Sequence, residues 1–142
     1  MKTILLTMLL ALVFPAVARC EAPAMSQIPF STMRAEFEPG DRIVIKEVLA
    51  SSPELALGDT VVIRGEYQLS SRESAGLRVS LTTIGKGSPE RLSARAGTIA
   101  TQGSDKFELE CKITRPGVMH VSFYPLPTGG SFGGVYIAPN KS

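Results

Sequence analysis

The sequence predicts an all-β sandwich of about seven strands, preceded by a cleaved signal peptide and a flexible lead-in. Three observations support this prediction. An apolar run near the N-terminus has the form of an export signal, short runs with a two-residue period recur after residue 39, and Gly, Pro, Ser and Asp separate those runs. With 142 residues, 44% of them hydrophobic and 20% charged, the chain has the composition of one folded domain.

The first 18 residues are expected to be a secretory signal peptide. Lys2 supplies the positive charge, residues 4–14 form the apolar run, and Ala16 and Ala18 are small residues at the two positions that signal peptidase reads. The run is too short for a membrane-spanning helix, which needs about 20 residues. We therefore expect an exported protein, periplasmic or extracellular, with no membrane span.

The remaining chain divides into three segments by composition. Residues 19–38 show no period and carry two prolines, so they are predicted to be a flexible N-terminal segment. The β-sandwich domain is expected over residues 39–138, and residues 139–142 form a C-terminal tail.

Seven runs within residues 39–138 have the composition and spacing of strands. They span residues 42–49, 60–69, 77–83, 92–101, 106–113, 118–124 and 134–138. In the first run Glu47 interrupts the alternation, as at an edge strand or a bulge. In the fourth run the apolar parity switches around Gly97, which indicates a bulge or a break.

The fifth run has the clearest strand pattern. Phe107, Leu109, Cys111 and Ile113 alternate with lysine and glutamate, the period of a strand with one buried face. No comparable helical stripe free of Gly or Pro occurs after the signal peptide. Because several runs offer a continuous apolar face that needs covering, a sandwich is favoured over an open sheet, and a small barrel is the alternative.

The order of these runs and turns resembles that of a known class of β-sandwich modules. The segments 58–59, 67–69, 120–125 and 132–136 form a frame that resembles immunoglobulin-like β-sandwich modules of exported bacterial proteins, over residues 40–138. The resemblance implies an immunoglobulin or fibronectin III-like sandwich. It transfers no catalytic or binding residue, and the immunoglobulin Cys-Trp-Cys signature is absent because the chain has no Trp.

Little in the sequence indicates catalysis, so we expect neither an enzyme nor a cofactor. The segment 129–133 matches G-x-S-x-G, but neither an acid nor a histidine follows it as a hydrolase triad requires. A hairpin loop is the favoured interpretation. The single histidine, His120, lacks the convergent ligands that a metal needs, so no metal site is expected. A net charge of +2 gives no footprint for nucleic acid.

The two cysteines could form a disulfide after export. Cys20 and Cys111 would meet in an oxidising compartment, but the alternatives are two free thiols or Cys20 linking two chains. Cys20 also lies where a lipoprotein cysteine would, although Arg19 lacks the small side chain that lipidation requires there.

The best binding residues that the sequence offers are the aromatic side chains Phe132, Tyr136 and Tyr124, near the loop 125–134. The alternative role for Phe132 is to cap the open end of the core. The leading hypothesis is an exported, non-catalytic module that binds or organises a protein partner. The alternative is a small carbohydrate- or ligand-binding domain that uses residues 125–136 on a surface glycan or other ligand.

Overall fold

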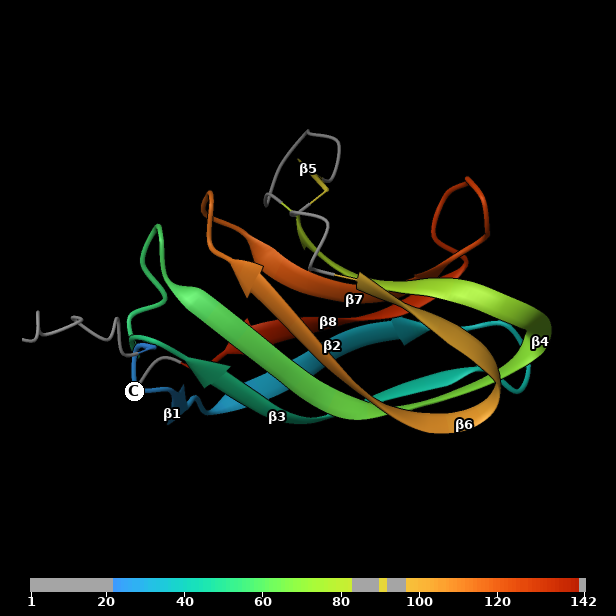
Figure 1. The fold of residues 1–142 in the computed structure, drawn as a ribbon, viewed down its shortest axis with the longest axis horizontal. Helices are drawn as coiled ribbons and strands as arrows, with labels where there is room; N and C mark the ends of the chain where they lie inside the picture. Colours follow the sequence, from blue (N-terminus) through green and yellow to red (C-terminus); the bar gives the residue numbers. More distant parts are fainter. Residues whose placement is uncertain (1–21, 83–89, 92–96, 141–142) are drawn as a thin grey trace, which may run out of the picture.

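A computed structural model describes residues 22–82, 90–91 and 97–140. These residues form antiparallel strands and no helix, so the all-β prediction is confirmed. The eight strands, two of which are only two residues long, build one curled sheet (Figure 1). The described residues contain no helix that could cross a membrane.

The order of strands along the chain differs from their order in the sheet. The strands are β1 Ser26–Gln27, β2 Phe30–Glu36, β3 Arg42–Ala50, β4 Thr60–Thr82, β5 Glu90–Arg91, β6 Gly97–Lys112, β7 Val118–Tyr124 and β8 Gly133–Pro139. In the sheet the order is β1-β3-β4-β7-β8-β2, and β5 and β6 also pair with β4.

Two long strands, β4 and β6, run through both halves of the curled sheet (Figure 1). In the first half, β4 pairs with β3 through residues 61–68, and in the second half it pairs with β7 through residues 76–82. The register of β4 with β6 shifts between Leu69 and Ser74, where β4 changes direction. Gly103, with a φ of +109°, provides the matching change in β6.

Four predicted strand ends are wrong, because each of the two long strands joins two runs that were predicted to be separate strands. The run 60–69 and the described part of the run 77–83 belong to one strand, β4. Residues 106–112 and the described part of the run 92–101 likewise belong to one strand, β6. The polar residues between the members of each pair were interpreted as turns. They bend the strand, but the chain stays extended and the ladder resumes beyond the bend.

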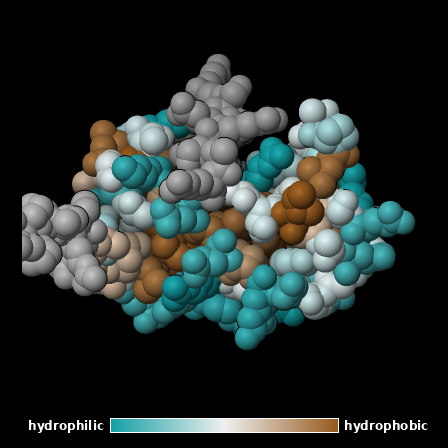
Figure 2. Space-filling view, viewed as in Figure 1, coloured by the Kyte–Doolittle hydropathy of each residue, from teal (hydrophilic) through white to brown (hydrophobic). Residues whose placement is uncertain are grey.

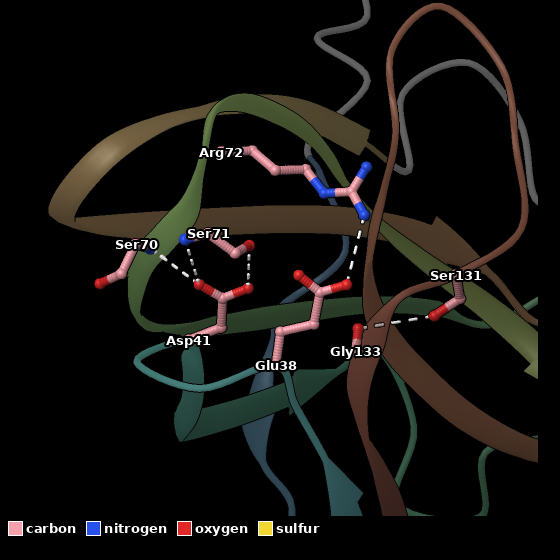
Figure 3. Close-up of polar contacts among 7 residues, drawn as sticks. All are labelled: Glu38, Asp41, Ser70, Ser71, Arg72, Ser131 and Gly133. Carbon is pink, nitrogen blue, oxygen red and sulfur yellow. Dashed lines mark hydrogen bonds and ion pairs between the residues drawn. The ribbon is translucent and has the colours of Figure 1, made fainter.

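The bend of β4 is held by a buried carboxylate from the turn before β3. Asp41 is 7% exposed and accepts hydrogen bonds from the Ser70 and Ser71 backbone N–H groups at 2.7 and 3.0 Å, and from Ser71 Oγ at 2.5 Å (Figure 3). Gly40 has a φ of +86°, and a Cβ there would lie 2.9 Å from Ser70 Cβ. Burial acts to raise the pKa of Asp41, but these hydrogen bonds and the charge of Arg72 outweigh it and lower the pKa.

The core lies between the two halves. Its largest fully buried side chains come from both of them: Phe123, Ile63, Leu69, Leu77, Leu81, Leu109, Met119 and Ile137. Across the core, the rings of Tyr67 and Phe123 meet edge to face at 6.1 Å. The inward faces predicted for residues 107–113 and 119–123 are confirmed, since every apolar member is buried. On the face drawn in Figure 2, hydrophobic residues lie in patches between hydrophilic ones.

The prediction of a flexible segment over residues 19–38 is wrong for its described part. Residues 26–27 pair with β3, and residues 30–36 pair with β8 at the edge of the sheet. Ile28, buried to 4% exposure, anchors the segment and donates its N–H to Val48 O. Residues 31–36 are exposed on both faces, so no apolar alternation marked this strand in the sequence.

The signal peptide over residues 1–18 lies outside the described residues. In the described part of the predicted tail, Pro139 ends β8 and Asn140 donates its N–H to Pro29 O at 2.9 Å.

Candidate ligand-binding cleft

A cleft of about 400 Å³ opens on the outer side of the second half, where β2, β7 and β8 lie together. Its lining combines polar and aromatic side chains with two glycines: Arg34, Glu36, Phe37, Glu38, His120, Ser131, Phe132, Gly133, Gly134 and Tyr136. Two of the three predicted binding residues, Phe132 and Tyr136, line this cleft. The third, Tyr124, lies outside it.

The cleft depends on the absence of a side chain at Gly134. This residue pairs with Ser122 of β7 and with Glu36 of β2. A Cβ at Gly134 would lie 2.5 Å from Ser122 Oγ and 2.7 Å from His120 Nε2. The imidazole therefore occupies space that any other residue at 134 would fill.

Stacked rings form one wall. The rings of His120 and Tyr136, which are cross-strand partners, lie 4.0 Å apart with an interplanar angle of 13°. Burial lowers the pKa of His120, so the imidazole is neutral at pH 7. Ser122 Oγ lies 2.8 Å from Nδ1 and 3.0 Å from Nε2 of the ring, next to Gly134. The wall is thus a rigid, uncharged aromatic surface.

Phe132 also lines the cleft and packs against the core. Its ring stacks on Phe123 with centroids 5.8 Å apart, and its N–H donates to Phe123 O at 3.0 Å. The Arg72 guanidinium carbon lies over the Phe132 ring, 3.8 Å from its centroid. Because Phe132 is partly buried against the core in this arrangement, the geometry favours the capping role for it.

Two ion pairs lie near the rim. Arg34 Nε donates to Glu36 Oε1 at 2.8 Å, and Arg72 Nη2 lies 3.3 Å from Glu38 Oε1 (Figure 3). Each carboxylate is therefore compensated by one guanidinium. The rim offers hydrogen-bond donors and acceptors without a large local charge.

Among the described side chains, the pair that most resembles a catalytic nucleophile and its base is Ser122 with His120. Ser122 is fully buried at 0% exposure, so its hydroxyl has no path to a substrate in this arrangement. Ser131, from the G-x-S-x-G match, lies in the loop between β7 and β8 and donates to Gly133 O at 3.5 Å. A nucleophile elbow instead requires a turn from a strand into a helix.

The remaining predicted chemistry involves metals and thiols. Among the residues that the structure describes, no group of three or more His, Cys, Asp or Glu side chains is placed to hold a metal ion. Cys111 is a free, buried thiol, and burial raises its pKa to about 12. Cys20, its predicted disulfide partner, lies outside the described residues.

Sequence reasoning did not identify Gly134, Arg34 or Glu36 as parts of a site. Their juxtaposition depends on the pairing of β2 with β8, and β2 has no periodic signal. No protein-family model, curated protein or solved structure matches the chain. The chemistry of the cleft is therefore the main guide to function.

Proposed function

We propose that this protein is an exported, non-catalytic binding module that holds a protein partner outside the cytoplasm. We further propose that the curled sheet is an immunoglobulin-like sandwich, with its two halves as the two layers. The N-terminal apolar run supports export. The observation that carries the binding function is the cleft beside β2, whose walls rest on paired strands.

The position of β2 favours an extended protein segment as the ligand. Within the described residues β2 pairs only with β8, so its other edge presents unpaired backbone groups. A partner strand added to that edge would form main-chain hydrogen bonds and pass beside Arg34 and Glu36. One of its side chains would then enter the cleft and contact Tyr136, which provides specificity.

The test is capture of a partner from the protein's own cell envelope by the chain from residue 19 onward. We expect the wild type and a Lys112→Ala control to retain the same partner, because Lys112 is exposed on β6. Tyr136→Ser and Glu36→Ala should release it. A partner that all four proteins retain equally would show that the cleft is not the binding surface.

A carbohydrate is the second candidate ligand, favoured by the stacked His120–Tyr136 wall. An aromatic wall beside paired charges suits a neutral ring that carries many hydroxyl groups. The absence of Trp counts against a broad stacking platform. Titration with neutral mono- and disaccharides should shift the NMR signals of Tyr136 if this candidate is correct. Unchanged signals would eliminate it.

A further inference from the structure

A second surface on the same face of the sheet contains an arginine that has no acidic partner among the residues that the structure describes. Arg78 of β4 is half-buried. The ion pairs among the described residues use Arg34, Lys46, Arg64 and Arg72, and Arg78 takes part in none of them. Partial burial of a cation costs free energy that a bound anion would recover.

Two glycines position the Arg78 side chain. A Cβ at Gly97 would lie 2.9 Å from Arg78 Cγ, and a Cβ at Gly76 would lie 3.2 Å from Arg78 Nε. The aliphatic stem therefore passes beside Gly97, and the guanidinium lies over Gly76. Side chains at these two positions would displace it, so the local sequence keeps the guanidinium against the sheet.

The groups around the guanidinium are those of a protein-recognition surface. Gly76 pairs with Ile99 on one side and with Tyr124 on the other, so Arg78 lies over the gap between these two side chains. The guanidinium carbon is 5.4 Å from the centroid of the Tyr124 ring. Ile99 is 64% exposed, so it provides an apolar surface beside a cation that forms no ion pair with the described residues. Arginine and tyrosine are enriched among residues that dominate binding energy.

Arg78 also lies in the same cross-strand row as Gly134 of the cleft. It pairs with Ser122, and Ser122 pairs with Gly134 at the cleft floor. Direct cross-strand partners point to the same face, and adjacent strands are about 4.8 Å apart. The two surfaces are therefore about 10 Å apart on one face, within reach of one partner.

We infer that Arg78, Tyr124 and Ile99 form a binding site for an acidic side chain flanked by apolar residues in a segment of the protein partner. The guanidinium would donate two parallel hydrogen bonds to the carboxylate, and the apolar neighbours would cover Ile99 and the edge of Tyr124. This inference rests on the proposed function for the class of partner, but it uses residues outside the cleft.

The test uses blocked peptides, because the partner's sequence is not needed to examine the chemistry. NMR spectra of the wild type are recorded with acetyl-Val-Glu-Val-amide, with the matched Gln peptide, and with sodium phosphate. We expect the Glu peptide to shift the Arg78 Nε–H, Tyr124 and Ile99 signals saturably. The Gln peptide should bind at least about fivefold more weakly, since it has no charge to offer the guanidinium.

Variants then assign the effect to the arginine. Arg78→Gln should abolish the Glu-peptide shifts at Tyr124 and Ile99, and Arg78→Lys should weaken them, because lysine cannot form the bidentate pair. Arg42→Gln, which removes an exposed arginine from β3, should leave them unchanged. If Arg78→Gln does not fold, the wild-type Arg78 Nε–H signal still reports the binding.

Two results would overturn the inference. Equal binding of the Glu and Gln peptides would show that the carboxylate is not recognised. Phosphate binding as tightly as the Glu peptide would reveal a general anion site with no preference for a protein segment. Neither result affects the cleft, because partner capture that depends on Tyr136 tests the proposed function separately.

Discussion

Replacing Asp41 by alanine should weaken the fold by removing the support of the β4 bend. The carboxylate accepts three hydrogen bonds from Ser70 and Ser71, and it is 7% exposed. A hydrogen bond to a charged group contributes about 1.5–3 kcal/mol, and an unpaired buried donor costs about 1–3 kcal/mol. Ser70 and Ser71 are themselves exposed, so water replaces part of what is lost. We expect a loss of about 2–4 kcal/mol, a large part of a typical stability of about 5–15 kcal/mol.

The effect of Asp41 should also depend on pH. Its pKa in the folded protein lies below the ordinary value of 3.8, because the hydrogen bonds favour the charged form. The stabilisation is therefore fully present above the unfolded-state pKa and is lost as the pH falls through the lower folded-state pKa. The difference between wild type and Asp41→Ala should be constant between about pH 7 and pH 5 and should shrink below about pH 4.

Urea unfolding of the two proteins at several pH values measures both effects. Asp105→Ala is the matched control, because that carboxylate is exposed and accepts a hydrogen bond only from the adjacent Lys106 N–H, at 2.7 Å. It should change the free energy of unfolding by less than about 0.5 kcal/mol. Equal losses for Asp41→Ala and Asp105→Ala would refute the role of Asp41, and so would a difference that persists unchanged at low pH.

Four further outcomes test the export, the register, the cap and the buried thiol. N-terminal sequencing of the exported protein should begin near Arg19, whereas a full-length cytoplasmic protein would contradict the signal peptide. In urea melts, Leu109→Ala should cost about 2–5 kcal/mol and Glu108→Ala less than about 1 kcal/mol, since Leu109 is 1% exposed and Glu108 is exposed. Phe132→Ala should lower the melting temperature, and an unchanged value would exclude the capping role. Cys111, with a pKa of about 12, should resist a thiol reagent at pH 8 until urea unfolds the chain; fast labelling of the folded protein would show that the thiol is accessible.

The strands that sequence reasoning located best are those with one buried face. Residues 118–124 were predicted with the bounds that β7 has, because Met119, Val121 and Phe123 alternate with more polar residues. β2 left no such signal, since only Phe30 at its start packs against the core and residues 31–36 are exposed along their pairing with β8. Sequence periodicity detects burial, and this strand is not buried.

The cleft was predictable only in part, for a related reason. Phe132 and Tyr136 were selected as aromatic residues near a glycine-rich loop, and both line it. The importance of Gly134 depends on its being opposite Ser122, and that pairing is a property of two strands together. Tyr124, the third aromatic residue selected, does not line the cleft. It lies beside Arg78 because it pairs with Gly76 of β4.

The two long strands have a consequence for how the protein unfolds. β4 and β6 remain paired through both halves of the curled sheet, from Thr60 with Lys112 to Arg78 with Gly97. Melting the ladder in one half therefore removes the support of the other half, and neither half is an independent cooperative unit. We expect a cavity made at one end of the molecule to make opening at the other end easier. We therefore expect the stability of the proposed binding face on β7 and β8 to depend on the distant pairing of β3 with β4.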